Sequence, residues 1–501
     1  MSQNVKSFNE YRVIQITNDL LKYVNNAACN AVTAHEVEVG LWDRILEIGR
    51  TGLQCFFDKV GTGDLGESVE LSDGRGIARI EEKSEREYKT VFGKFTLTRA
   101  TYGVTEKQMI ELVPVDTRLK LPEGKYSYLL QDWDQSFAIE NSFGHTNEII
   151  QRILKLGQSV DSLERMNQKM AIAVEEFRDN KEVFSPETEG SIIVVTADGK
   201  GIPMKKEVIE KPIANHKTKG IKLNKKQIAI VGSVYTIDPL VRTPEDVIRS
   251  LFATQKDCEY SNDRPRACNK NLYASLSYEE NGKQVDAGEK IFSLLHEEVL
   301  LRSVHTLVPT ILLMDGQRSL WELGKKYLPC DRIEILDLLP VTPRLWMAAH
   351  LYNKEGSKEA EEFVEKYLLL ILQGKVEKVI REWKNLGIKN NLRGNKKASL
   401  TKICKYLLKN KNRLRYDEYL KNGYPIASGV IEGACRYFIK DRMERAGMRW
   451  TIDGAQAMLD VRSVFLNGDW VEFQKFRIKK QEEKLYPHSE MIEMTEWPLA
   501  A

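Results

Sequence analysis

The chain has 501 residues, a hydrophobic fraction of 42% and a formal net charge of +3 at pH 7. This length predicts about two to four domains, and the apolar content excludes an extensively disordered chain. No run approaches the ~20 apolar residues of a membrane helix. The first residues lack the basic start and apolar core of a signal peptide, so we expect a cytoplasmic protein. The seven cysteines contain no CxxC pair, which argues against a zinc ribbon or a disulfide framework.

The first part of the chain is predicted to be mainly helical. Val37, Leu41, Ile45 and Ile48 recur at roughly helical spacing, and Gly61 closes this segment. Residues 88–102 alternate around a central Phe-Gly, which is typical of a small β-hairpin. Residues 145–177 return to helical spacing. We therefore expect residues 1–180 to form a mainly helical N-terminal region that contains one hairpin.

A break at residues 156–159 divides the last of these helical segments. Ser159 can cap a second helix from about Val160, because its hydroxyl can accept the free N–H groups of the first turn. Helix, glycine-containing turn, helix is the pattern of a helix-turn-helix, which would present Arg165 and Lys169 to DNA. A plain pair of packed helices is the alternative and the commoner arrangement. The polar residues 179–190 are predicted to be a linker.

From Ser191 onward the order of the predicted elements becomes informative. We expect three strands, a helix, a strand, a helix and a strand, over residues 191–198, 227–237, 271–278, 288–302, 309–314, 319–327 and 332–338. This is the order of an RNase H-like fold, an antiparallel meander extended by parallel strands through helical crossovers. We predict an α/β, RNase H-like (retroviral-integrase-like) catalytic core over residues 191–340, closed by a helix at 430–443 within residues 426–470.

Residues 341–425 are predicted to be a basic helical insertion into this core. Helical patterns cover residues 345–352, 359–372, 375–385 and 399–407. Between Lys375 and Lys421 there are fifteen Lys or Arg residues against four acids, a local balance of +11. Residues 471–501 are interpreted as a C-terminal tail.

Three carboxylates are the candidate catalytic groups. Asp198 and Asp315 each follow an apolar run and precede a glycine, and Glu432 lies in the first turn of the closing helix. Phosphoryl transfer between DNA strands uses two Mg²⁺ ions about 3.5–4 Å apart, and Mg²⁺ prefers oxygen ligands. We expect Asp198, Asp315 and Glu432 to hold two Mg²⁺ ions, for which Mn²⁺ can substitute. A turn is the alternative for either Asp-Gly taken alone.

The expected DNA-binding residues are basic side chains near these acids. Phosphate contacts are expected from Lys200, Lys225, Lys226, Arg436, Lys440, Arg442, Arg445 and Arg449. A solvated loop is the alternative for the lysines between the first two strands, and a surface Glu432–Arg436 pair is the alternative on the closing helix. Trp450 is more readily interpreted as a core anchor than as a platform for an unpaired base.

Six segments of the sequence resemble the DDE-type bacterial insertion-sequence transposases of the ISKra group. They are VVTADGKGIPM, RPRACNKNLYASL (Arg264–Leu276), MDGQRSLW, ILDLLPVTPRLWMAAHLY (Ile335–Tyr352), SGVIEGACRYFIKDRMERAGMRW and LNGDW (Leu466–Trp470), and the resemblance covers Ser191–Trp470. It implies an RNase H-like core with Asp198, Asp315 and Glu432 as the metal-binding triad. Relatives tend to have a histidine where this chain has Pro340.

These observations together predict a DNA transposase of an insertion sequence. It is expected to bind the terminal inverted repeats of its element, cleave DNA at the ends and join the 3′-hydroxyl ends to target DNA. The partners are therefore DNA and, because two ends must meet, further copies of the chain on DNA, with no membrane partner. The alternatives are a transposase-derived DNA-binding protein without catalytic activity, for which Pro340 is a reason, and an RNase H-like nuclease without strand transfer.

Overall fold

The computed structural model describes residues 8–104, 109–181, 186–205, 226–252, 264–280, 282–303, 308–445 and 447–497, except the side chains of residues 8–10, 83, 186 and 280. The chain divides into two compact units. The first unit combines Met1–Ala173 with Trp470–Ala501, and the second unit is Val174–Asp469. No helix in the described ranges is both long enough and apolar enough to cross a membrane.

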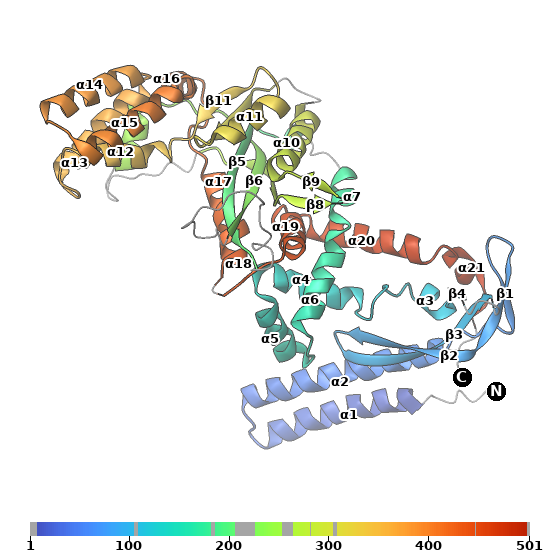
Figure 1. The fold of residues 1–501 in the computed structure, drawn as a ribbon. Helices are drawn as coiled ribbons and strands as arrows, with labels where there is room; N and C mark the ends of the chain where they lie inside the picture. Colours follow the sequence, from blue (N-terminus) through green and yellow to red (C-terminus); the bar gives the residue numbers. More distant parts are fainter. Residues whose placement is uncertain are drawn as a thin grey trace, which may run out of the picture. The chain divides into compact units, whose positions relative to one another are not determined.

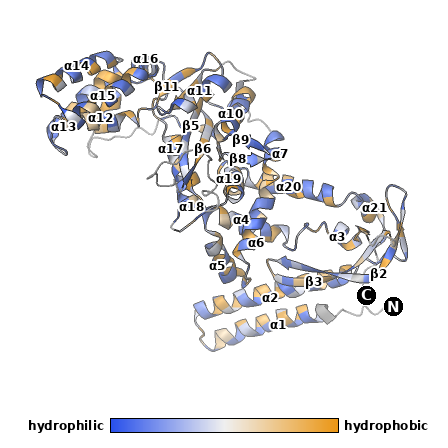
Figure 2. Ribbon diagram, in the orientation of Figure 1, coloured by the Kyte–Doolittle hydropathy of each residue, from blue (hydrophilic) through white to orange (hydrophobic). Residues whose placement is uncertain are grey.

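The first unit begins with a pair of long helices, α1 (Phe8–Cys29) and α2 (Ala34–Val60) (Figure 1). A capping box starts α2: the Glu36 N–H donates to the Thr33 hydroxyl at 3.3 Å, and the Thr33 N–H donates to the Glu36 carboxylate at 3.1 Å. Figure 2 shows hydrophobic and hydrophilic residues alternating along both helices. These two helices lie in the segment for which the sequence predicts helices.

A four-stranded antiparallel sheet follows, in the order β1-β2-β3-β4. Its strands are β1 (Ser68–Glu70), β2 (Gly76–Thr90), β3 (Gly93–Val104) and β4 (Met109–Leu112). The predicted hairpin is its central pair, β2–β3, in which Thr90 pairs with Gly93. Gly93 has a φ of +125°, which a residue with a Cβ rarely adopts.

Six helices complete the described part of the first unit. They are α3 (Pro114–Arg118), α4 (Tyr128–Glu140), α5 (Phe143–Leu154), α6 (Val160–Ala171), α20 (Trp470–Leu485) and α21 (Ser489–Met494). Residues 471–501, interpreted from sequence as a tail, therefore contain two helices. Ile492 and Trp497 pack in the same core as Tyr102 of β3, and the Trp497 indole N–H donates to the Val60 carbonyl at 2.8 Å.

The second unit is built on a mixed five-stranded sheet, in the order β11-β10-β5-β6-β7. The strands are β5 (Ile192–Pro203), β6 (Lys226–Ile237), β7 (Cys268–Ser275), β10 (Thr310–Met314) and β11 (Ile333–Leu336). β5, β6 and β7 are antiparallel, whereas β5–β10 and β10–β11 are parallel. Residues 192–197 of β5 are all buried, as their continuous apolar sequence predicts.

Helices cover both faces of this sheet. They include α7 (Val174–Asp179), α10 (Ala287–Ser303), α11 (Arg318–Tyr327) and α19 (Ile452–Leu466), whereas α9 (Pro244–Phe252) packs against helices of the insertion. A small hairpin joins β8 (Tyr278–Glu280) to β9 (Lys283–Val285). A Cβ at Gly232 of β6 would lie 2.6 Å from Ile291 of α10, so glycine permits this close packing. The strands and helices expected between residues 191 and 338 occur in the predicted order, and the mixed α/β class is confirmed.

The insertion is helical, as predicted. Its helices are α12 (Val341–Ala349), α13 (Lys358–Leu372), α14 (Val376–Lys389), α15 (Gly394–Lys409) and α16 (Tyr416–Lys421). Buried side chains of these helices, among them Val364, Trp383 and Leu407, join the hydrophobic core that contains the strands of the sheet. The insertion and the sheet therefore share one core.

The closing helix differs in one respect from its prediction. It consists of α17 (Gly429–Ala434), a π-helical turn over Cys435–Lys440, and α18 (Asp441–Met443). A π-turn accommodates one extra residue per turn and occurs mostly as a single turn inside an α-helix. Ile431, Cys435 and Phe438 are buried as predicted, while Glu432 is exposed.

Candidate active site

Asp198 and Asp315 lie at the same level of two neighbouring parallel strands. Ile193 of β5 pairs with Thr310 of β10, and Val195 pairs with Leu312. The same register, carried three residues further, places Asp315 beside Asp198. Burial and, to a smaller extent, the negative charge of Asp198 raise the pKa of the Asp315 carboxyl. The two carboxylates are therefore close enough to interact electrostatically.

The position of Asp198 within its strand corrects the expected local structure. The sequence predicted a strand that ends at Asp198, with a turn as the alternative for this Asp-Gly, but β5 continues to Pro203. Gly199 pairs with Ile230 of β6 instead, and no turn forms there. The Asp198 carboxylate accepts the Gly199 N–H at 2.7 Å, and the Cys435 thiol lies 3.5 Å from its other oxygen. Burial raises the pKa of this thiol, so Cys435 stays protonated beside Asp198.

Asp315 follows directly after β10 and is held from the backbone side. Its carboxylate accepts the Gln317 N–H at 2.8 Å, and its carbonyl accepts the indole N–H of the buried Trp321 at 2.7 Å. A Cβ at Gly316 would lie 2.5 Å from the ring of Tyr406 on α15. Glycine is needed here because the insertion packs closely against the candidate site, a reason that the sequence alone did not reveal.

Glu432 lies in the first turn of α17, on a helix whose start is fixed close to the sheet. The Ser428 hydroxyl accepts the Ile431 N–H at 3.4 Å and lies 3.4 Å from the hydroxyl of Thr196 on β5. The side chain of Glu432 is exposed. Its charge contributes to the raised pKa values of Asp337 and Cys435, which places all three in one electrostatic neighbourhood.

The fourth acid of this neighbourhood, Asp337, was not predicted from the sequence. It follows β11, is 5% exposed, and accepts the N–H groups of Leu339 at 2.8 Å and Ser428 at 3.2 Å. Burial, helped by the charges of Glu432 and Asp315, raises its pKa to about 6. The signal was present in the sequence, because Asp337 also follows an apolar strand, in the segment Ile333–Leu336.

These acids are the right type of ligand for Mg²⁺, but in this structure they do not converge on one point. All four donors are carboxylates, the ligands that Mg²⁺ prefers, and a cation would relieve the repulsion between Asp198 and Asp315. In the described part of the chain, however, no group of three or more His, Cys, Asp or Glu side chains converges closely enough to hold a metal ion. The structure brings the first two acids together and leaves Glu432 on the rim.

The basic residues of the second unit that were predicted to bind DNA differ in their exposure. Lys225 lies outside the described residues. Lys200 is half-buried, whereas Lys226, Arg436, Lys440, Arg445 and Arg449 are exposed. Lys226 pairs with Glu444 at 3.1 Å, and Arg436 lies 3.9 Å from Asp441 rather than pairing with Glu432.

Arg442 requires a correction. Its side chain is only 1% exposed and lies over the Trp450 ring at 5.1 Å, so it does not offer a surface contact to DNA. Its spacing from Cys435 and Phe438 puts it on the buried face of the closing helix, a signal that was available in the sequence. The buried Trp450 donates its indole N–H to the Met443 carbonyl at 3.0 Å, which confirms its interpretation as a core anchor.

The predicted helix-turn-helix region corresponds to α5 and α6 of the first unit. The Ser159 hydroxyl caps α6 by accepting the Ser162 N–H at 3.1 Å, as expected. Arg165 and Lys169 are both exposed. Arg165 pairs with Asp161 one turn earlier, and Lys169 pairs with Glu123 at 3.3 Å. DNA binding by this region stays a prediction.

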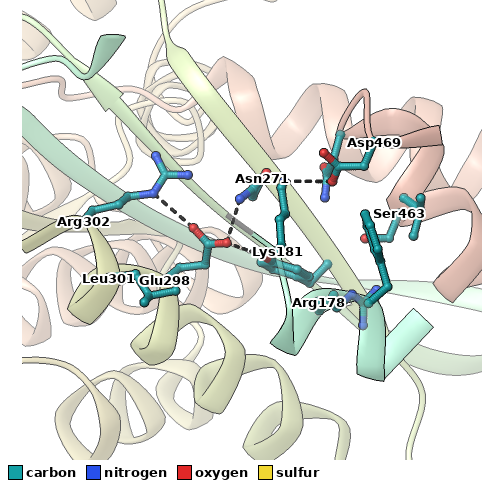
Figure 3. A pocket seen from close by; sticks show the side chains of 12 residues that line it. Arg178, Lys181, Asn271, Glu298, Leu301, Arg302, Ser463 and Asp469 are labelled. Atoms are coloured by element: carbon teal, nitrogen blue, oxygen red, sulfur yellow. Dashed lines mark hydrogen bonds and ion pairs between the residues drawn. The ribbon is translucent and has the colours of Figure 1, made fainter. Parts of the chain in front are cut away.

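A small pocket elsewhere in the second unit is built from paired charges (Figure 3). At its centre the Glu298 carboxylate accepts hydrogen bonds from Asn271 at 2.6 Å, Tyr273 at 2.6 Å and Arg302 at 3.1 Å. Lys181 pairs with Asp469 at 2.8 Å. The Asn271 side-chain oxygen and one Arg178 nitrogen are buried there without a hydrogen-bond partner among the described residues, while the charged groups named above pair with one another, so the pocket is interpreted as a structural polar cluster.

Comparisons with other proteins add little to this geometry. No protein-family model matches the sequence, and no curated protein matches it. Among solved structures, the chain is similar to the Drosophila P element transposase strand transfer complex, with 10% sequence identity and a TM-score of 0.22. The match covers 69% of this chain and 80% of that chain. A TM-score this low does not establish a common fold.

Proposed function

We propose that this protein is a DDE-type DNA transposase of the ISKra group of insertion sequences. In this proposal residues 191–340 and 426–470 form an RNase H-like core, residues 341–425 are its basic insertion, and residues 1–180 bind DNA. The observation that carries the proposal is the common level of Asp198 and Asp315 on adjacent parallel strands. The strand order β7-β6-β5-β10-β11, with an antiparallel meander followed by parallel strands, supports it.

The acids take separate roles in the proposed reaction. Asp198 and Asp315 would hold Mg²⁺ from the sheet, and Glu432 would complete the set from α17. The bound ions would activate the attacking oxygen and stabilise the departing one. The backbone N–H groups of Gly199 and Gln317 orient the two aspartates, and those of Leu339 and Ser428 fix Asp337 behind them.

The proposed substrate is the DNA of the element itself. The protein would bind the terminal inverted repeats, cut at the ends and transfer the freed 3′-hydroxyl groups to target DNA, as an oligomer. Lys200, Lys226, Arg436, Lys440, Arg445 and Arg449 are the described basic residues offered for phosphate contacts in the second unit. Arg165 and Lys169 are offered in the first unit.

Cleavage of a labelled duplex that carries the end of the element tests this proposal. The wild-type protein should cut at the end in the presence of Mg²⁺, whereas Asp198→Asn and Glu432→Gln should bind the duplex normally without cutting it. Glu359→Gln is the matched control, because Glu359 is also exposed in the first turn of a helix but lies on α13. Cutting by either variant at the wild-type rate would refute the assignment of that residue.

A second candidate function is DNA binding without catalysis. The observation in its favour is Pro340, which stands where relatives tend to have a histidine. Pro340 precedes α12, and its carbonyl accepts a hydrogen bond from Arg344. A proline side chain, unlike a histidine, has no proton to donate or accept in catalysis. Tight binding of the element end by the wild-type protein, with no Mg²⁺-dependent cutting, would favour this function.

A further inference from the structure

Helix α15 of the insertion is unusual in its charge. It contains five lysines, Lys396, Lys397, Lys402, Lys405 and Lys409, and no aspartate or glutamate. All five side chains are exposed, and none forms an ion pair with any described residue. Lys366 and Lys411, also in the insertion, instead lie 3.8 Å from Glu382 and 2.5 Å from Glu377. The positive charge of α15 is therefore uncompensated by local acids.

The opposite side of α15 is anchored in the core. Leu400, Ile403, Cys404 and Leu407 are buried in the hydrophobic core of the second unit. This packing fixes which way the lysines face. Gly394, Lys397, Ala398, Thr401, Lys402 and Lys405 line a shallow groove of about 530 Å³ along the exposed side.

A second pocket, lined by four basic side chains and two glutamates, Glu322 and Glu334, lies at the C-terminal end of α15. Lys409 from α15 and Arg318 from α11 line it, and neither forms an ion pair with a described residue. Arg413 lies over the Trp321 ring at 4.0 Å and pairs with Glu334 at 2.7 Å. Gly316, the residue after Asp315, also lines the pocket. The basic side of α15 thus ends beside one of the two central acids.

We propose that the exposed lysines of α15 bind the phosphodiester backbone of DNA and guide one strand into the pocket beside Gly316. This inference rests on the proposed function, and it assigns to the insertion a DNA contact surface distinct from the residues named above. Phosphate contacts with lysine need charge and position but no base-specific geometry. Binding at α15 is therefore independent of DNA sequence.

The spacing of the lysines suits a nucleic-acid strand. Lys402, Lys405 and Lys409 lie on one side of the helix, and a rise of about 1.5 Å per residue spreads them over about 10 Å. This span corresponds to about three phosphates of one strand, at about 3.4 Å each along the duplex axis. Leu408 is the one large apolar side chain of α15 that is exposed. An amphipathic helix binds an anionic membrane by burying a broad apolar face, which α15 does not expose. The charge of α15 therefore fits DNA better than a membrane surface.

The test compares charge-reversed variants of the full chain in DNA binding. The triple variant Lys402→Glu/Lys405→Glu/Lys409→Glu is measured by fluorescence anisotropy on a labelled duplex of arbitrary sequence, without divalent metal, from about 50 to about 200 mM salt. The slope of log K against log salt should fall by about 2.7, since each phosphate contact contributes about 0.9. The neutral triple variant with glutamine at the same positions should give the same loss of slope with a smaller loss of affinity.

The matched control is Lys354→Glu/Lys421→Glu/Lys475→Glu, which changes the same charge at exposed lysines without ion pairs to described residues. It should keep the wild-type slope. An unchanged slope in the α15 variants, or an equal loss in the control, would overturn the inference. The inference would also be overturned if the α15 variants lost binding to phosphatidylserine vesicles but kept wild-type binding to DNA. Because DNA binding is measured without metal, it is tested independently of cleavage. If the protein binds DNA through α15 but never cuts it, the proposed catalysis is refuted and the inference about α15 still holds.

Discussion

Asp134 of α4 is a buried carboxyl whose titration should control the stability of the first unit. It is 0% exposed, and burial raises its pKa to about 7 from an ordinary value of 3.8. The Gln158 side-chain N–H₂ donates to both carboxylate oxygens, at 2.8 and 2.7 Å, while the Gln158 carbonyl oxygen is buried without a partner among the described residues. The hydrogen bonds from Gln158 favour the charged carboxylate and lower the pKa of Asp134, but the opposing effect of burial is larger.

The sign and size of the effect follow from linkage. The folded state binds the proton more tightly than the unfolded state, so stability is greatest at low pH. It is lost as the pH rises from the unfolded to the folded pKa. A shift of about three pKa units corresponds to about 4 kcal/mol, of which about 3 kcal/mol falls between pH 5 and 8. An asparagine side chain at this position does not titrate, and its amide can donate to the Gln158 carbonyl oxygen.

We therefore expect Asp134→Asn to be stabilising at pH 8 and nearly neutral at pH 5. For a unit of this size, about 3 kcal/mol corresponds to a Tm difference of about 6–12 °C, measured by calorimetry on the full chain. Asp161→Asn, an exposed acid on α6, is the control and should show no such divergence with pH. A difference between Asp134→Asn and wild type that stays constant from pH 5 to 8 would refute the reasoning.

Three further predictions concern the insertion. Gly316→Ala places a Cβ 2.5 Å from the Tyr406 ring, so the insertion must shift beside the candidate site. Cleavage of the element end should fall more than about tenfold, and urea unfolding should show a stability loss of about 1–3 kcal/mol. Unchanged cleavage would contradict this prediction. Tyr406→Phe removes a buried hydroxyl that has no partner among the described residues, so the urea midpoint should stay or rise slightly. A loss above about 1 kcal/mol would reveal a missing partner. Trp383→Ala should cost about 3–5 kcal/mol, because Trp383 is 0% exposed and stacks on Phe363; a loss below about 1 kcal/mol would be inconsistent with that packing.

The order of elements in the second unit was predictable because its strands are buried on both faces. Continuous apolar runs such as residues 192–197 have no alternative but a central strand or a buried helix, and their short length selects the strand. The predicted carboxylates also lie near one another for a local reason. Asp198 and Asp315 both follow runs that pair in parallel, so their positions are set by the register of β5 and β10.

The remaining features depend on contacts that a single segment does not encode. The extension of β5 past Asp198 requires the partner strand β6, and its tip pairs Met204 with Trp450, which lies far along the chain. The burial of Arg442 arises from packing against Trp450. The approach of Tyr406 to Gly316 arises from how the insertion joins the core of the sheet. For Asp337 and Arg442, by contrast, the sequence itself indicates the observed position: Asp337 follows an apolar run, and Arg442 has the helical spacing of the buried residues Cys435 and Phe438.

The division of the first unit between two distant stretches of sequence determines the order in which the chain can fold. Its core needs Ile492 and Trp497, and the Trp470 indole N–H donates to Asp132 at 2.6 Å. During synthesis these residues leave the ribosome after all of Val174–Asp469, and domains generally fold as units once their residues are available. The second unit, Val174–Asp469, can therefore complete its core first. Residues 1–173 can complete theirs only after α20 and α21 have been synthesised.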